Sequence, residues 1–246
     1  PLPNNSLTLS DDNICAGEIA DILLFNSVLG VTYQLRLDSD NSNVGSAQAG
    51  NGGILTFHDS PASTTTYNVF AINVNGCTNE LNDKAIIQVY PLANITLTVS
   101  DPIICIGENA VISVDNSETG VSYQLRLDSD NSLVGASVPG NGGSVNFEVS
   151  PVSTTLFNVL ATTANSCHAE LADRALVSVN PTPDESLVVS SPSICNGEIA
   201  EIIVYTSQIG VSYQLRLDID NTSVGIPVVG NGGNISFFVT PIVSTL

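Results

Sequence analysis

Apolar and polar residues alternate along several short segments of this chain, most clearly at residues 31–37. In that segment Val31, Tyr33, Leu35 and Leu37 share one face of an extended strand, and the residues between them are polar. A period of two is typical of a strand with one buried face. Similar segments, bounded by residues typical of turns, predict seven strands in the first 90 residues. They are 6–10, 18–26, 31–38, 43–48, 53–58, 64–74 and 84–90.

The whole pattern repeats with a period of 90 residues. The sequence VTYQLRLDSDNSNVG at 31–45 returns as VSYQLRLDSDNSLVG at 121–135 and as VSYQLRLDIDNTSVG at 211–225. Constant spacing without insertions indicates an array of similar domains. We therefore expect three domains, which are repeat 1 (1–90), repeat 2 (91–180) and repeat 3 (181–246).

Seven short strands in about 90 residues are typical of an immunoglobulin-like β-sandwich. No segment has the period of a capped amphipathic helix, so we predict an all-β fold of tandem sandwiches. Residues 89–92 pass from one repeat to the next without a flexible linker, which predicts an end-to-end arrangement as a rod. Repeat 3 stops before the equivalents of 64–74 and 84–90, so it lacks the last two strands. We expect that it is not stable alone, and that the native chain extends beyond both Pro1 and Leu246.

The charge balance removes several classes of function. The chain carries 24 acidic and 5 basic residues, a formal net charge of −19 at pH 7. Nucleic-acid binding requires clustered Lys and Arg, so we expect no nucleic-acid partner. No apolar run approaches the roughly 18 residues of a membrane span, so we expect no direct membrane insertion. The two histidines lie outside repeated positions and phosphate-binding motifs are missing, so we predict no enzyme, no catalytic residue and no cofactor.

Paired carboxylates recur directly after the strand at 31–38 and after its equivalents in the other repeats. Carboxylate and amide oxygens are the ligands that Ca²⁺ prefers, so one interpretation is a calcium site in each repeat. We favour a turn in which Asp, Asn and Ser bond to their own backbone, because turn chemistry alone accounts for these residues. The candidate ligands are Asp38, Asp40 and Asn41, then Asp128, Asp130 and Asn131, then Asp218, Asp220 and Asn221.

The five basic residues occupy only two columns of the repeat. A row of cations could bind an anionic glycan, but the large excess of carboxylates favours ion pairs within each domain. The two columns are Arg36, Arg126 and Arg216, and Lys84 and Arg174.

Several short motifs are shared by the repeats and mark their type. They are Ile14-Cys15, Gly17-Glu18, Tyr33-Gln34-Leu35, Val44-Gly45, Gly52-Gly53, Ser60-Pro61, Thr64-Thr65-Thr66, Tyr67-Asn68-Val69 and Gly76-Cys77. With these motifs the chain resembles, over its whole length, the immunoglobulin-like repeats of very large cell-surface adhesins of gliding bacteria, which the type IX secretion system exports. The resemblance implies a secreted protein of the bacterial cell surface with a role in gliding motility, and it implies no ligand site.

Five cysteines in a surface protein predict disulfide bonds with one cysteine left over. Pairing within repeats would join Cys15 to Cys77 and Cys105 to Cys167. In an immunoglobulin-like sandwich those positions lie at opposite ends, about 30 Å apart, whereas a disulfide needs about 4.4–6.8 Å between Cα atoms. End-to-end stacking would instead bring Cys15 beside Cys167, which is the pairing we favour. The partner of Cys195 would lie beyond the end of the sequence.

Two hypotheses for function remain. The first is a structural stalk or filament segment of a large secreted adhesin, which holds a distal adhesive region away from the cell. Its partners are the neighbouring repeats of the same long chain, and the sequence does not specify a surface ligand or glycan. The alternative is an adhesion module that binds calcium or a glycan on its loops. Aromatic residues make up only 5% of the chain and the repeated ones fit core positions, which favours the first hypothesis.

Overall fold

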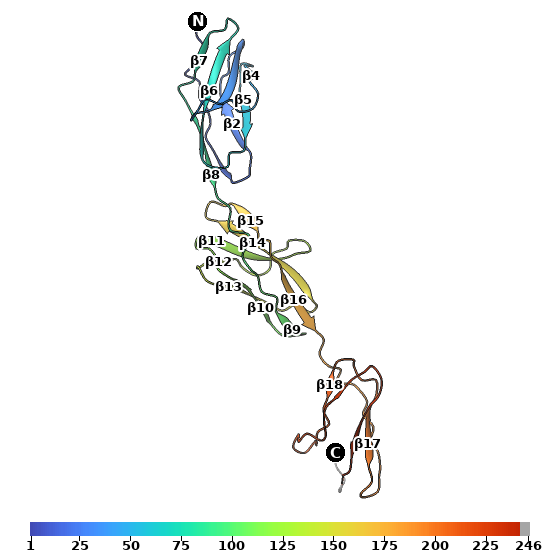
Figure 1. Ribbon diagram of the computed structural model, residues 1–246. Coiled ribbons are helices and arrows are strands. Elements are labelled where there is room, and N and C mark those ends of the chain that lie inside the picture. Colours follow the sequence, from blue (N-terminus) through green and yellow to red (C-terminus); the bar gives the residue numbers. More distant parts are fainter. Residues whose placement is uncertain (242–246) are drawn as a thin grey trace. The chain divides into compact units, whose positions relative to one another are not determined.

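The computed structural model describes residues 1–241, and every regular element in these residues is a β-strand (Figure 1). The prediction of an all-β, immunoglobulin-like fold is confirmed. This part of the chain contains no helix long and apolar enough to cross a membrane. The chain divides into two compact units, Pro1–Val179 and Asn180–Leu246. Strands of the first unit pair within repeat 1 or within repeat 2, and the last five positions of repeat 3, 242–246, lie outside the described residues.

Repeat 1 is a sandwich of two sheets. Its strands are β1 (Asp12–Cys15), β2 (Ala20–Leu24), β3 (Val31–Leu37), β4 (Gln48–Ala49), β5 (Leu55–Asp59), β6 (Thr65–Asn73), β7 (Thr78–Glu80) and β8 (Ala85–Tyr90). One sheet pairs β2 with β5, and the other has the order β1-β8-β6-β3-β4 with β7 on β6. β1 runs parallel to β8, while the other pairs are antiparallel.

Repeat 2 has the same topology. Its strands are β9 (Ile103–Cys105), β10 (Ala110–Val114), β11 (Val121–Leu127), β12 (Val138–Pro139), β13 (Val145–Val149), β14 (Thr155–Thr163), β15 (His168–Glu170) and β16 (Ala175–Asn180). β10 pairs with β13, and the larger sheet has the order β12-β11-β14-β16-β9 with β15 on β14.

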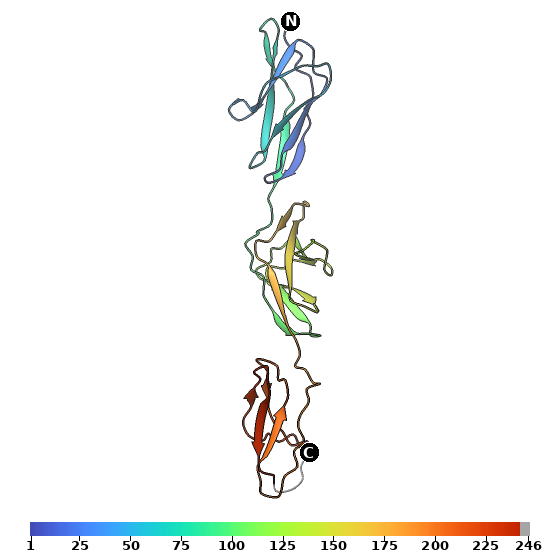
Figure 2. The same cartoon turned by 90° about the vertical axis from the view of Figure 1, so that its right-hand side faces the viewer.

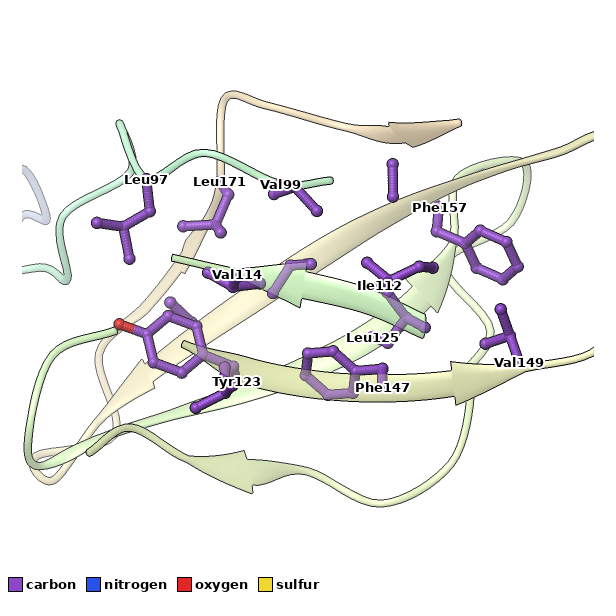
Figure 3. Close-up of a cluster of buried hydrophobic side chains, with 14 of the residues drawn as sticks. Leu97, Val99, Ile112, Val114, Tyr123, Leu125, Phe147, Val149, Phe157 and Leu171 are labelled. Carbon is purple, nitrogen blue, oxygen red and sulfur yellow. The ribbon is translucent and has the colours of Figure 1, made fainter. Parts of the chain in front are cut away.

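The core between the two sheets of repeat 2 explains why these segments form strands. β11 pairs with β14 over seven residues, from Val121↔Thr163 to Leu127↔Phe157. The alternation turns Tyr123 and Leu125 inward, where both are fully buried among apolar side chains of both sheets (Figure 3). Full burial of such a side chain contributes about 1.5–3 kcal/mol each. This burial on one face is what the period of two predicts.

Two predicted strands of repeat 1 are wrong in extent, and two strands were not predicted. The segment 6–10 contains only the isolated bridge Leu9↔Leu24, and 43–48 contributes the bridge Arg36↔Asn43 and the start of the short β4. β1 and β7 were not predicted. Both are short strands that form by backbone pairing to β8 and β6. Their own residues show no clear alternation of apolar and polar side chains, which is the signal that the prediction uses.

Repeat 3 forms fewer and shorter strands in the residues that are described (Figure 2). They are β17 (Ala200–Val204), β18 (Ser212–Tyr213), β19 (Val228–Val229) and β20 (Ile235–Val239). β17 pairs with β20 and β18 with β19. Its buried apolar cluster consists of three residues, Val204, Ile235 and Phe237. Residues 181–241 contain no counterpart of β14, so the segment after β18 has no strand to pair with.

Candidate functional site: the disulfide between repeats and the polar network of each repeat

A disulfide bond joins Cys15 of repeat 1 to Cys167 of repeat 2. The Cα atoms lie 5.6 Å apart, and the two residues are separated by 152 positions in the sequence. That distance lies within the range that an unstrained disulfide accepts. The bond is the pairing between repeats that the sequence analysis favours. Because Cys15 and Cys167 are bonded to each other, the alternative bonds Cys15–Cys77 and Cys105–Cys167 are not formed.

β1 and the turn after it position Cys15. Cys15 is the last residue of β1 and lies opposite Tyr90, the last residue of β8. The turn that follows is held because the Cys15 amide donates to Glu18 Oε2 at 2.7 Å and Gly17 adopts a φ of 91°. Cys15 therefore lies at the end of repeat 1 where the polypeptide leaves for repeat 2.

The turn between β14 and β15 positions Cys167. The Thr163 amide donates to the Cys167 carbonyl at 2.9 Å, and the Cys167 amide donates to Thr163 Oγ1 at 3.2 Å. Ser166 has a φ of 63° in this turn, where repeat 1 has Gly76. Cys167 is fully buried, whereas its equivalent Cys77 is partly exposed.

The remaining cysteines are free thiols at the same two positions of the repeat. Cys105 and Cys195 are exposed and correspond to Cys15, while Cys77 corresponds to Cys167. Repeats 1 and 2 therefore each contain one cysteine at the position of Cys15 and one at the position of Cys167. In the first unit only the pair across the joint between repeats 1 and 2 is bonded.

A polar network lies on the larger sheet of repeat 1, around Arg36 of β3. Arg36 Nε donates to Asn68 Oδ1 at 3.0 Å, and Arg36 Nη2 contacts Glu80 Oε2 at 2.5 Å. The Asn68 side chain is buried, and its Nδ2 donates to Asn41 Oδ1 at 2.9 Å. Lys84 Nζ lies 2.6 Å from an oxygen of Asp38. Both basic columns thus make ion pairs within repeat 1, as the sequence analysis favours.

Repeat 2 contains the same network with one more ion pair. Arg126 Nε donates to Asn158 Oδ1 at 2.8 Å, and its Nη2 contacts Glu170. Arg174 lies 2.7 Å from Asp128 and 2.5 Å from Glu170, so Glu170 bridges the two cations. Charge-assisted pairs of this kind occupy the guanidinium donors. Both guanidinium groups of repeat 2 thus have carboxylate partners within their own domain, as the sequence analysis favours.

The recurring Asp-x-Asp-Asn segments form turns at the ends of β3 and β11 and after β18. In repeat 1 Asp40 Oδ1 accepts from the Ser42 amide at 2.9 Å, an Asx turn. Asp130 and Asp220 accept in the same way from Ser132 and Thr222. Asn41, Asn131 and Asn221 take a left-handed backbone with φ of 57–60°, a conformation that Asn tolerates better than most residues.

These turns account for the predicted calcium ligands without a metal. Asp38 and Asp128 face Lys84 and Arg174. Asp218 follows β18 in the equivalent turn of repeat 3. In residues 1–241 no three His, Cys, Asp or Glu side chains converge as a metal site. Calcium binding stays a prediction that the arrangement of these side chains does not favour.

Hydrogen bonds in the turns shift the acidity of the carboxyl groups. The hydrogen bond from Lys84 lowers the pKa of Asp38, and bonds from Ser42 lower the pKa of Asp40. Bonds from Ser132 and Thr222 likewise lower the pKa of Asp130 and of Asp220. A donor favours the charged form of a carboxylate, so these groups are ionised in the folded protein at neutral pH.

Sequence reasoning missed the buried asparagines at the centre of the networks. Asn68 and Asn158 lie on β6 and β14 between buried neighbours and are almost fully buried themselves. The signal was present, because an amide at a repeated position between two apolar residues, as in Tyr67-Asn68-Val69, indicates a specific partner. Residues 1–241 leave no buried side-chain polar atom without a hydrogen bond.

Comparisons with known proteins return similarity of fold only. No protein-family model matches the sequence, and no curated protein matches it. A three-domain fragment of titin is 12% identical, with 97% of this chain and 87% of the fragment covered and a TM-score of 0.47. A marsupial T cell receptor is 9% identical over 96% of this chain and 99% of its own, with a TM-score of 0.45.

A third solved structure is a bacterial adhesin described as Ca²⁺-stabilised, which helps an Antarctic bacterium bind ice. It is 13% identical, with 98% of this chain and 66% of the adhesin chain covered and a TM-score of 0.42. These likenesses carry no ligand and no role to this protein. Its assignment to the immunoglobulin-like sandwiches rests on its own strand pairing.

Proposed function

We propose that this protein is a structural stalk or filament segment of a large secreted cell-surface adhesin. The observation that carries the proposal is the bond between Cys15 and Cys167, which joins repeats 1 and 2 in addition to the peptide chain. Two connections at separate points of one joint restrict bending at that joint. A segment that holds an adhesive region away from a surface needs such stiffness, and the bond supports the proposal of a rod for repeats 1 and 2.

Charge and redox chemistry support the same proposal. A net charge of −19 makes neighbouring molecules repel each other and opposes side-by-side aggregation. Disulfide bonds persist outside the cell, where the surroundings are oxidising. The resemblance of the sequence motifs extends the proposal to the surface of gliding bacteria, to export by type IX secretion and to gliding motility. The proposal includes no catalytic activity.

Small-angle X-ray scattering of the full chain tests the stalk. At 30–40 Å per repeat, estimated from strand length, we expect a maximum dimension of roughly 100 Å. The variant Cys15→Ser removes the bond, so we expect a broader distance distribution because the joint bends more freely. Cys195→Ser replaces an exposed free thiol and should leave the profile unchanged. A compact particle, or equal profiles for all three proteins, would contradict the proposal.

A further inference from the structure

Asparagine is followed directly by glycine at several turns of the chain, and these Asn-Gly sequences fall into two groups. Because glycine has no side chain, the backbone nitrogen after such an asparagine is unshielded and can reach the side-chain amide carbon. One group occupies a single column of the repeat, in the turns before β5, β13 and β20, and consists of Asn51-Gly52, Asn141-Gly142 and Asn231-Gly232. The other group consists of Asn75-Gly76 and Asn196-Gly197, which are not repeated elsewhere in the sequence.

The asparagine side chains of the repeated column are held by hydrogen bonds. Asn51 Oδ1 accepts from the Gly53 amide at 2.7 Å and from Ser27 Oγ at 3.0 Å. The amide two positions further on also donates to Asn141 Oδ1 at 2.7 Å and to Asn231 Oδ1 at 2.8 Å. Each side chain therefore forms an Asx turn. Its amide carbon cannot approach the next backbone nitrogen until these bonds open.

Asn75 lies in the turn between β6 and β7, and its side chain is free to rotate. The residue is exposed, and its side chain makes no hydrogen bond with any residue in 1–241. The turn is held instead by Asn73, whose Oδ1 accepts from the amides of Asn75 and Cys77, each at 3.0 Å. The Gly76 amide donates to the Asn73 carbonyl at 2.9 Å. Only this bond, in an exposed turn, has to open before the Gly76 nitrogen can react.

Asn196 has a similar environment in the turn before β17. It is exposed, and its side chain has no hydrogen-bond partner among the described residues. The turn is closed on either side of it, because the Glu198 amide donates to the Cys195 carbonyl at 3.1 Å and the Cys195 amide donates to Glu198 Oε2 at 2.9 Å. The Asn196 side chain takes no part in these bonds.

The exposure of the turn at Asn75 does not depend on what precedes repeat 1. In repeat 2 the equivalent turn contains Cys167, which is bonded to repeat 1, and Asn165 and Ser166 are nevertheless exposed. Ser166 has a φ of 63° where Gly76 has 77°, a conformation that residues other than glycine rarely adopt. The serine side chain shields the backbone nitrogen that follows Asn165. Repeat 2 therefore contains a less reactive version of the same turn.

We propose that Asn75 and Asn196 are sites of spontaneous deamidation, and that the Asx turns protect the asparagines of the repeated column. The backbone nitrogen of the following glycine loses its proton and bonds to Cγ of the asparagine. The side-chain nitrogen takes up a proton and leaves as ammonia, so a succinimide remains. Water then hydrolyses the succinimide at either carbonyl, which gives aspartate or isoaspartate. No oxidation or reduction takes place, and water is the only co-reactant.

Each event adds a negative charge within two residues of a free cysteine, Cys77 or Cys195. The isoaspartate product also adds a methylene group to the backbone of the turn. The turns beside the bonded cysteines Cys15 and Cys167 contain no Asn-Gly sequence. Deamidation therefore alters the turns beside two free thiols and leaves the turns of the disulfide unchanged. It does not depend on the proposed stalk function.

The test incubates the full chain in mildly alkaline buffer, with and without denaturant, and follows each asparagine by peptide mapping and mass spectrometry. In the folded chain Asn75 and Asn196 should convert at least about tenfold faster than the asparagines of the repeated column, whose hydrogen bonds must open first. In denaturant all of these sites should convert at similar rates, because glycine follows each asparagine and the turns are lost. Electron-transfer fragmentation should identify both aspartate and isoaspartate among the products.

Exchange of one residue between repeats 1 and 2 provides matched variants. Gly76→Ser should slow conversion of Asn75 several-fold, and Ser166→Gly should bring Asn165 to a rate close to that of Asn75. A Cβ atom at Gly76 would meet no atom within 4 Å, so Gly76→Ser leaves the turn intact. Equal rates at Asn51 and Asn75 in the folded chain would overturn the proposal. So would an unreactive Asn75 under conditions in which the denatured chain converts, or an unchanged rate in Gly76→Ser.

Discussion

Repeats 2 and 3 contain nearly the same strand sequence in different surroundings. VSYQLRL forms the seven-residue β11 in repeat 2, but of the same seven residues in repeat 3 only Ser212–Tyr213 is a strand. β11 has neighbours on both sides, whereas among residues 1–241 β18 pairs only with β19. The alternation of apolar residues therefore decides which face of the segment is apolar. The length of the strand is decided by the strand beside it.

Some local features persist in repeat 3 without that neighbour. The Gln208 amide donates to Tyr213 Oη at 2.8 Å, as the Glu118 amide donates to Tyr123 Oη at 2.8 Å. A Cβ atom at Gly230 would lie 2.1 Å from the carbonyl oxygen of Gln208, so the backbones approach as closely as they do at Gly140. Contacts within one turn thus form independently, whereas the core and the ion pairs need the complete sandwich.

The largest effect should come from the disulfide, which acts on the first unit alone. We expect Cys15→Ser to lower the free energy of unfolding of Pro1–Val179 by about 5 kcal/mol, because the bond closes a loop of more than 100 residues in the unfolded chain. Hydrogen exchange, measured for each unit over a series of denaturant concentrations, gives the two free energies of unfolding. Residues of repeat 3 should unfold at an unchanged denaturant concentration, as should both units of the control Cys195→Ser. A shift in repeat 3 would contradict the independence of the two units.

The next effect compares equivalent tyrosines. Tyr123→Ala should destabilise the first unit by about 3–5 kcal/mol, because it opens a cavity in a closed core. Tyr213→Ala should cost about 1 kcal/mol or less in its unit, because Tyr213 is already partly exposed. Thermal unfolding of both variants measures the difference. Equal losses would show that Tyr213 is as well buried in solution as Tyr123.

A smaller effect compares equivalent arginines. Arg126→Ala should cost about 1–3 kcal/mol, because it leaves Oδ1 of the buried Asn158 without its hydrogen-bond donor. Arg216→Ala should change stability by less than about 0.5 kcal/mol, as is usual for exposed positions. Chemical denaturation gives both values. If Arg216→Ala costs as much as Arg126→Ala, Arg216 has a partner in solution.

The smallest effect should be the same in both repeats, because it belongs to the turns. Asp130 and Asp220 have lowered pKa values in the folded state, so the stability they contribute is fully present above their ordinary pKa of 3.8. It is lost as the pH falls below 3.8 through the folded pKa. The difference in melting temperature between the parent and Asp130→Ala should therefore shrink below about pH 4. Asp220→Ala should behave in the same way. If the difference in melting temperature grows on acidification, the predicted pH dependence is contradicted.

The sequence predicted the class of fold because the alternation of apolar residues at 31–37 and its equivalents is a local feature repeated at constant spacing. The spacing of the cysteines alone left two pairings open, and the choice of Cys15–Cys167 also required the sandwich topology and end-to-end stacking of the repeats. β1 could not be predicted in this way, because Asp12–Cys15 becomes a strand only through its parallel pairing with β8. The buried role of Asn68 was missed for a related reason, since its partners Arg36 and Asn41 come from a different strand and turn. Contacts between distant segments remain invisible to a reading of local pattern.

The covalent path through the molecule changes what a pulling force can reach. Tension applied at the two ends passes from Cys15 through the sulfur atoms to Cys167, so the polypeptide between them is a closed loop outside the loaded path. That loop spans 152 positions, which would otherwise release roughly 500 Å of extended chain at about 3.4 Å per residue. Both sandwiches of the first unit can lose their fold under load while this length stays withheld. Reduction of this one bond adds the withheld length to the part of the chain that a pulling force can extend.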